Sequence, residues 1–155
     1  ADIEAFRAEL LMQKSSNPKI GAEVAEMRDR LAAAHPPAGP FDAKFGPGRA
    51  MEIDLAAQTL ALAAGSTVTE TGLQLGVGSD LNDARGLFQR LQLVQRLLGA
   101  EPKDMSSLAG GATALVLRET GAADIATLEA KLEATAQKAK RDVDAIIEGA
   151  KRNDA

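Results

Sequence analysis

The stretch Phe41-Asp-Ala-Lys-Phe-Gly-Pro-Gly-Arg-Ala-Met-Glu-Ile-Asp54 is the most distinctive part of this 155-residue sequence. It follows His35-Pro-Pro-Ala-Gly-Pro40, whose prolines stop a helix because they lack the backbone donor and clash with helical geometry. Gly and Pro continue through its first half, whereas its second half suits a helix. We therefore predict a Gly/Pro-rich loop that joins two helices, the second beginning near Met51.

Apolar residues recur at helical spacing on both sides of this loop. The pattern predicts six helices, over residues 2–14, 21–34, 51–64, 79–98, 106–120 and 124–150. Residues 66–78 are predicted to be a long loop with at most one helical turn. Aromatic residues make up only 3% of the chain, which suits small-residue packing between helices better than a β-sandwich. The expected fold is all-α, a single helical bundle over residues 1–155.

Small and polar residues stand where helix caps are expected. We predict N-caps at Asp2, at Ser79 or Asp80, at Ser106 or Ser107, and at Asp124, and helix ends at Gly65 and Gly121. The apolar stripes predicted to face the core are Ile3, Phe6 and Leu10 in the first helix, Leu87, Leu91, Val94 and Leu98 with Phe88 and Leu97 in the fourth, and Ile125, Leu128, Leu132, Ala139, Val143 and Ile146 in the last.

Composition excludes several classes of function. The formal net charge of −4 argues against nucleic acid as a partner, since phosphate binding needs a basic face. No apolar run is long enough to cross a bilayer, and no signal peptide is recognisable, so we expect a cytoplasmic protein without a membrane partner. Cysteine is absent, which excludes disulfides and thiolate chemistry. Because the sequence begins at Ala1 and not at Met, we expect either a processed chain or a piece of a longer one.

A search for catalytic residues and metal ligands finds none that we would assign. His35 is the single histidine, and its position before Pro36 predicts a solvent-facing structural residue. Gly76-Val-Gly78 lacks the third glycine and the preceding strand of a phosphate-binding loop, so we predict a flexible loop. Gly110-Gly111 lies within a helical pattern, where close packing against a neighbouring helix is the simplest explanation.

A polar corner is predicted where the Gly/Pro-rich loop meets the next helix. Gly46 and Gly48 could let backbone amides approach an anion, and Lys44 and Arg49 would add positive charge. Carboxylates follow in the first helical turn, where the helix dipole favours them. Two interpretations stay open: a purely structural corner, or a surface that contacts a partner domain or a nucleotide.

The same segment resembles the bifunctional glutamine synthetase adenylyltransferase/adenylyl-removing enzymes. Helical domains of that family carry D-x-K-x-G-x-G-G-I-x-D-I-E-F, followed three residues later by Gln; here Asp42 to Leu55 and then Gln58 occupy these positions. Flanking segments also resemble the family: Glu26-Met-Arg28, Leu60-Ala-Leu62, Leu115-Val-Leu-Arg-Glu-Thr-Gly121 and Leu128-Glu-Ala-Lys-Leu132. The opening Phe-Asp resembles the C-terminal copy of the domain, a helical domain of the type associated with PII-uridylyltransferases.

The resemblance implies a parent enzyme in which a nucleotidyltransferase domain binds ATP and Mg²⁺ and transfers AMP to a tyrosine of glutamine synthetase. Two metal ions suit that step because they stabilise both the entering and the leaving oxygen. This chain would be a non-catalytic helical domain without a cofactor, packing on the nucleotidyltransferase domain and helping to position glutamine synthetase or the PII protein. The residues implied in the interdomain or ligand contact are Lys44, Gly46, Gly48, Arg49, Glu52, Asp54 and Gln58.

The segment also departs from the family motif. Arg49 stands where the family has a glycine, and arginine does not adopt left-handed backbone conformations as cheaply as glycine. Glu52 and Asp54 keep the charge of the family's Asp and Glu but exchange their lengths. These departures leave open a diverged, stand-alone protein-binding module with no enzymatic role. A third hypothesis is a small-ligand site for ATP, ADP or glutamine between Lys44 and Asp54.

Overall fold

The computed structural model describes residues 2–15, 19–67 and 70–153, and within these ranges it contains helices and no strand. The all-α prediction is therefore confirmed. The described α-helices are α1 (Ile3–Ser15), α2 (Ile20–Ala34), α3 (Ala50–Ala63), α4 (Thr71–Leu75), α5 (Asp80–Leu98), α6 (Gly110–Thr120) and α7 (Ile125–Asn153), and a 3-10 helix, η1 (Pro102–Ser107), precedes α6. The additional helix, α4, is a single short turn within the predicted loop 66–78.

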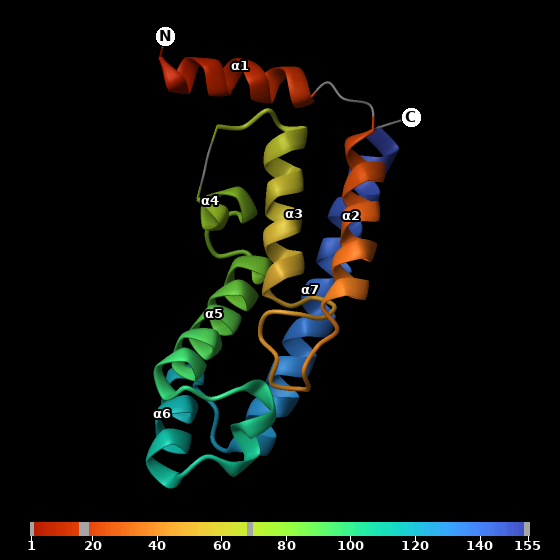
Figure 1. Ribbon diagram of the computed structural model, residues 1–155. Coiled ribbons are helices and arrows are strands. Elements are labelled where there is room, and N and C mark those ends of the chain that lie inside the picture. Colours follow the sequence, from red (N-terminus) through yellow and green to blue (C-terminus); the bar gives the residue numbers. More distant parts are fainter. Residues whose placement is uncertain (1, 16–18, 68–69, 154–155) are drawn as a thin grey trace.

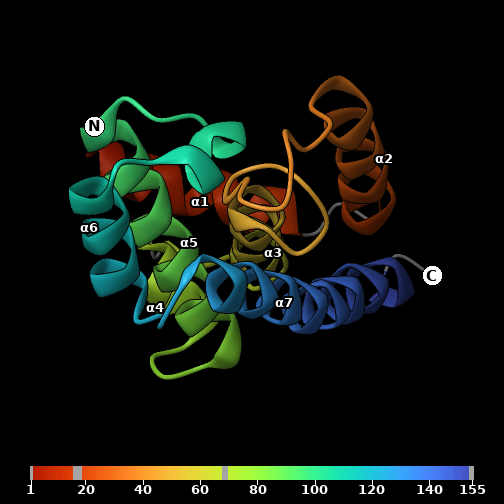
Figure 2. The ribbon, with the colours of Figure 1, turned by 90° about the horizontal axis from the view of Figure 1, so that it is seen from below.

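The longest helix, α7, is the element against which most of the bundle packs. It contacts α2, α3, α5 and α6. Its C-terminal half runs behind α2 and α3, and its N-terminal half lies near α5 and α6 (Figure 1). The view from below shows α7 extending from beside α5 to the C-terminal end of the chain (Figure 2). This arrangement places the loop at residues 35–49 between α2, α3 and the middle of α7.

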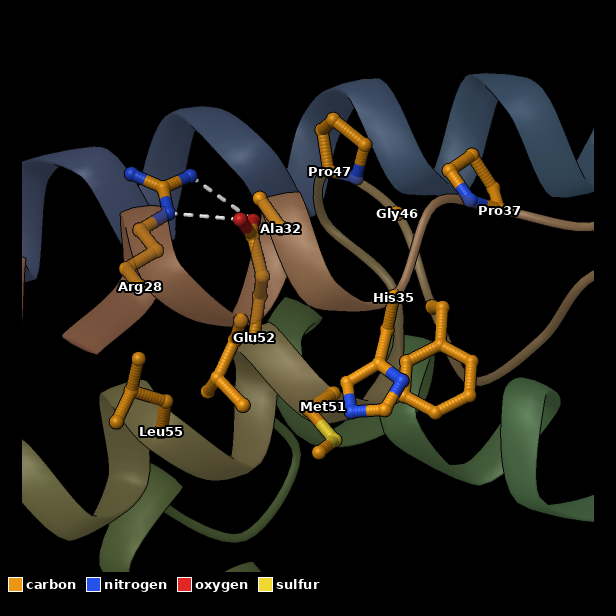
Figure 3. Close-up of a pocket in the computed structure, with 11 residues that line it drawn as sticks. Arg28, Ala32, His35, Pro37, Gly46, Pro47, Met51, Glu52 and Leu55 are labelled. Carbon is orange, nitrogen blue, oxygen red and sulfur yellow. Dashed lines mark hydrogen bonds and ion pairs between the residues drawn. The ribbon is translucent and has the colours of Figure 1, made fainter.

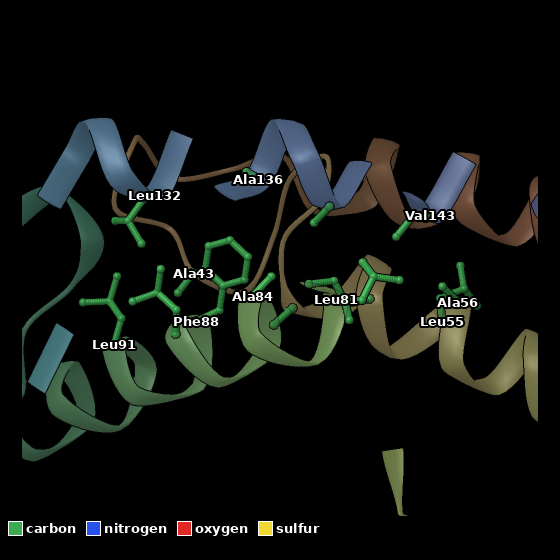
Figure 4. Packing of buried hydrophobic residues seen from close by; sticks show 14 of the residues in the cluster. Ala43, Leu55, Ala56, Leu81, Ala84, Phe88, Leu91, Leu132, Ala136 and Val143 are labelled. Carbon is green, nitrogen blue, oxygen red and sulfur yellow. The ribbon is translucent and has the colours of Figure 1, made fainter. Parts of the chain in front are cut away.

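The core lies between α3, α5 and α7. Phe88 and Leu91 of α5 are fully buried, as are Leu132 and Val143 of α7 (Figure 4). The apolar stripe predicted for the last helix is thus confirmed at Leu128, Leu132, Ala139 and Val143, which are all buried. Within the stripe predicted for the fourth helix, Leu97 was wrongly included, since this residue is 71% exposed.

The amphipathic pattern of α1 has a different outcome. Its predicted core stripe faces solvent, with Ile3 79% exposed and Phe6 63% exposed. Instead α1 lies across the end of α3 at a steep angle (Figure 1), and its half-buried side carries Arg7 and Leu11. The periodicity correctly predicted a helix, but the core contact expected from it was wrong.

Most predicted caps are present. The side chains of Asp2, Ser79 and Asp124 each accept a hydrogen bond from an amide two or three residues later, at 3.1, 3.2 and 2.7 Å. Gly65 and Gly121 follow their helices with φ of +59° and +64°, the left-handed conformation that ends a helix. These N-caps and helix ends could therefore be predicted from the sequence.

The helix predicted over residues 106–120 begins later than expected. Pro102 starts a 3-10 turn that is closed by a reciprocal capping box between Glu101 and Asp104, and this turn includes both proposed cap serines. The α-helix starts at Gly110 instead. Gly110 and Gly111 are exposed, and nothing lies within 4 Å of a Cβ added to either, so the predicted close packing of these glycines was wrong.

Candidate functional site

The loop between α2 and α3 is organised by a buried carboxylate, Asp42. One of its oxygens accepts hydrogen bonds from the amides of Lys44 and Phe45, both at 2.9 Å, and the other accepts from the amide of Ala38 at 2.9 Å. Asp42 is only 5% exposed, so these three donors replace the water that the carboxylate loses. An Asp at this position therefore determines the shape of the loop.

Gly48 is the point at which this loop touches α7. Its φ is +70°, and a Cβ built there would overlap the carbonyl of Ala136 and crowd the amide of Lys140 at 2.7 Å. Both the backbone conformation and the close approach to α7 require glycine. Gly46 also has a positive φ, but its surroundings are roomier.

The carboxylate of Glu52 already accepts a hydrogen bond from the Gly48 amide, the donor that an external anion would need. Its Oε2 accepts from the amide of Gly48 at 2.8 Å, at the N-terminus of α3. A carboxylate there is favoured by the helix dipole. Because the protein supplies its own anion at this helix end, the Gly46–Gly48 turn is a structural corner rather than an open anion cradle.

Glu52 also belongs to an ion-pair network that joins three helices. Arg28 of α2 donates Nε to one Glu52 oxygen at 2.7 Å and Nη2 to the other at 2.9 Å, and its Nη1 donates to Asp144 of α7 at 2.6 Å. Lys140 donates to the second oxygen of Asp144 at 2.6 Å. The two-pronged contact with Glu52 is the geometry in which guanidinium and carboxylate pair most strongly.

The network shifts the pKa of two residues, Arg28 and Asp144. The hydrogen bonds from Arg28 to Glu52 raise the pKa of Arg28 above its usual value, more than burial lowers it. Burial raises the pKa of Asp144, but hydrogen bonds from Lys140 and Arg28 outweigh it and leave the pKa below the usual value for aspartate. The charged forms of Arg28 and Asp144 are therefore stabilised in the folded protein.

Arg49 turns away from the polar corner and into the protein. It is 6% exposed, its guanidinium lies 5.4 Å from the centre of the Phe88 ring, and its Nη2 lies 3.5 Å from Glu133. Burial lowers the pKa of Arg49, with partial compensation from Glu133 and Asp42. No described residue accepts a hydrogen bond from its Nη1. Its φ is −85°, so the conformational penalty expected where Arg replaces the family's glycine was wrong.

The remaining predicted residues, Lys44, Asp54 and Gln58, lie outside the Arg28–Glu52 network. Asp54 pairs with Arg85 of α5 at 2.6 Å, Lys44 is exposed with its Nζ 4.7 Å from the centre of the Phe45 ring, and Gln58 is exposed on α3. The structure thus brings Gly48 and Glu52 together. Lys44 and Asp54 instead line a separate surface hollow with residues of α5, and Arg49 points inward. Among the described residues, no three His, Asp or Glu side chains are grouped so that they could hold a metal ion.

Sequence reasoning missed four residues that build this corner. Arg28, Asp42, Arg85 and Asp144 were not among the predicted site residues. Asp42 had a usable local signal, since an Asp before a Gly/Pro-rich turn often bonds the amides that follow it. Arg28 appeared only within the family-like segment Glu26-Met-Arg28, and its partners could not be predicted because they lie 24 and 116 residues away.

A small apolar pocket lies beside the network, between α2, the loop and α3. Leu31, Pro37, Phe45, Met51 and Leu55 line it together with Arg28 and Glu52, and its volume is about 80 Å³. Figure 3 shows the Arg28–Glu52 pair at one end and His35 on the opposite side. The His35 ring, which is exposed as predicted, stacks on Phe45 with centroids 4.7 Å apart.

Comparisons with known proteins identify two curated relatives, and both carry the same name. No family model and no solved structure matches the chain. The bifunctional glutamine synthetase adenylyltransferase/adenylyl-removing enzyme of Mesorhizobium japonicum is 27% identical over 95% of this chain, and that of Rhizobium meliloti is 30% identical over 96%. The chain spans only 16% and 17% of these relatives. In the described part of the chain, no helix is long and apolar enough to cross a membrane.

The similarity extends over nearly all of the chain, well beyond the motif at residues 42–58. It therefore includes both the loop built by Asp42 and Gly48 and the helices that the Arg28 network connects. The resemblance inferred from the motif is confirmed: this chain is a homologue of one segment of the bifunctional glutamine synthetase adenylyltransferase/adenylyl-removing enzymes.

Proposed function

We propose that this chain is a non-catalytic helical domain of a cytoplasmic glutamine synthetase adenylyltransferase, corresponding to the C-terminal helical domain of such enzymes. It packs on a nucleotidyltransferase domain, which binds ATP and Mg²⁺, and helps to position glutamine synthetase or the PII protein. The observation that carries the proposal is similarity over 95% of this chain but only 16% of the relative's length. A segment of that share fits one domain of a larger enzyme.

The geometry of the corner supports a structural role for the motif. Glu52 is engaged by Arg28 and the Gly48 amide, and Asp54 is engaged by Arg85. Carboxylates engaged in this way position helices rather than act on a substrate. The exposed members of the motif, Lys44 and Gln58, are then the side chains available to a partner domain.

Titration of the purified chain with the nucleotidyltransferase part of the Rhizobium meliloti relative tests the proposal. We expect saturable association by calorimetry, and no transfer of AMP to glutamine synthetase by the chain alone in the presence of ATP and Mg²⁺. Absence of association would refute the interdomain role and favour a stand-alone binding module. Adenylylation by the chain alone would refute the non-catalytic assignment.

A matched pair of charge reversals locates the contact. Lys44→Glu in the loop is expected to weaken the association about tenfold, because a like charge opposite an interface residue reduces electrostatic complementarity. Arg118 of α6 is 73% exposed and pairs only with its neighbour Glu119 among the described residues, so Arg118→Glu serves as the control. Equal effects of the two variants would place the contact elsewhere.

A further inference from the structure

The pocket between α2, the loop and α3 has no role in the corner described above. Its walls come from Leu31 of α2, Pro37 and Phe45 of the loop, and Met51 and Leu55 of α3. Prolines and a stacked aromatic pair give it stiff walls, since Pro37 has a restricted backbone and the ring of Phe45 is held against His35. The hollow is therefore formed before any occupant arrives.

The size of the pocket limits what it can receive. Its volume is about 80 Å³. Sites for drug-sized molecules and cofactors have roughly 300–1,000 Å³, so a nucleotide does not fit. For comparison, an engineered cavity of about 150 Å³ binds one benzene molecule. The smaller space here holds only a few non-hydrogen atoms, which is the size of one aliphatic side chain.

The charges around the pocket limit the occupant further. The guanidinium of Arg28 already donates to both oxygens of Glu52 and to Asp144, and Glu52 also accepts from the Gly48 amide. Neither charge is left unpaired for an occupant of opposite sign. A charged group entering the pocket would lose water without gaining a partner, whereas an apolar side chain gains from burial.

We propose that this pocket receives a single uncharged side chain of leucine or methionine size from a partner protein. The identity of that partner, the nucleotidyltransferase domain, rests on the proposed function, whereas the chemistry of the pocket does not. Side chains that fill a preformed, desolvated pocket at an interface commonly account for much of the binding energy. The pocket would thus be the anchoring point next to the exposed Lys44.

The chemistry is tested on the chain alone with amino-acid probes of one backbone. N-acetyl-leucinamide and N-acetyl-methioninamide, at millimolar concentration, are expected to shift the NMR methyl signals of Leu31, Met51 and Leu55. N-acetyl-alaninamide and N-acetyl-glutamate amide should not. Equal shifts from the alanine probe, or none from the leucine and methionine probes, would overturn the proposal.

Two substitutions on the same helix give the matched control. Ala32 lines the pocket and Ala33 does not, yet both are exposed on α2. Ala32→Leu, or Ala32→Met as a second variant, fills the hollow from within and should abolish the probe shifts. Ala33→Leu should leave them unchanged. Unaltered shifts in both Ala32 variants would show that the probes bind elsewhere, which would overturn the assignment.

The partner step is tested separately, with the titration described for the proposed function. Ala32→Leu is expected to weaken association with the nucleotidyltransferase part at least tenfold, and Ala33→Leu less than twofold. Unchanged affinity in Ala32→Leu would refute the pocket as an anchor while leaving the interdomain role intact. If the unmodified chain does not associate at all, the proposed function fails, and the probe experiment still decides whether the pocket takes an apolar side chain.

Discussion

The corner at residues 42–54 and the helix α1 differ in how their sequence patterns relate to their contacts. The stripe of α1 follows helical spacing closely, yet Ile3 and Phe6 lie in solvent. The corner has no regular pattern, yet Gly48 meets the backbone of α7 and Glu52 pairs with Arg28 of α2, while Asp42 holds the loop between them in shape. The comparison teaches that periodicity identifies a face of an element, whereas specific long-range contacts determine whether that face is buried.

The largest effect is expected where the loop touches α7. Gly48→Ala combines a left-handed backbone penalty of about 1–2 kcal/mol with overpacking of about 1–3 kcal/mol against the Ala136 carbonyl. Gly78 has a similar φ of +75° with nothing within 4 Å of an added Cβ, so Gly78→Ala measures the backbone penalty alone. Denaturant unfolding of both variants checks the prediction. Equal losses would mean that the loop can move away from α7.

The next effect concerns the network that joins α2, α3 and α7. Arg28→Met should lower the free energy of unfolding by about 2–3 kcal/mol, because it leaves Glu52, with a side chain 15% exposed, without its cation. The control is Arg30→Met, which removes a pair whose side chains are 71% and 69% exposed and should cost about 0–0.5 kcal/mol. A loss in Arg28→Met no greater than in Arg30→Met would contradict a coupling role for the network.

Arg49 offers a change in the opposite direction. Arg49→Met keeps much of the packing against Phe88 and removes a buried guanidinium whose Nη1 has no described partner. We expect stabilisation by about 1–2 kcal/mol, since apolar replacement of a buried charge is often favourable. Thermal unfolding measures it, and Glu133→Gln serves as the companion variant that removes only the carboxylate. Destabilisation by Arg49→Met would show that the pair with Glu133 contributes more than its burial costs.

A smaller, pH-dependent effect is expected at Asp144. The pKa of Asp144 is lower in the folded protein than the usual aspartate pKa of about 3.9. At pH values between these two pKa values, the folded state therefore binds fewer protons at Asp144 than the unfolded state does. The stability that Asp144 contributes is therefore present above about pH 4 and is lost as the pH falls through the folded pKa. The difference in unfolding midpoint between the unmodified chain and Asp144→Asn should narrow on acidification. A constant difference down to about pH 2.5 would contradict this.

The smallest effect is expected in α1. Phe6→Ser should change the free energy of unfolding by less than about 0.5 kcal/mol, because the side chain is already in solvent. Leu132→Ala in α7, which removes a fully buried side chain, should cost about 2–5 kcal/mol. A comparable loss in Phe6→Ser would remove the contrast between α1 and the packed part of the molecule.

Much of the fold could be predicted because its signals are local. Ser79 and Asp124 each bond an amide three residues later, and the glycine ends of α3 and α6 depend only on their own φ. The start of α6 was misplaced because a capping box at Glu101 competes with the serines that follow. At the site, Glu52 was found by its helix-terminal position, but its partner Arg28 was not.

The sequence by itself determined the all-helical class, most helix ends and the relation to one segment of the adenylyltransferases, since these depend on spacing, capping chemistry and a contiguous motif. Only the tertiary structure decided that Arg49 turns inward, that Arg28 links Glu52 to Asp144, and that a small apolar pocket opens beside them. The physical reason is distance along the chain: Arg28 and Asp144 are 116 residues apart, and no local pattern specifies which of several arginines and carboxylates will meet.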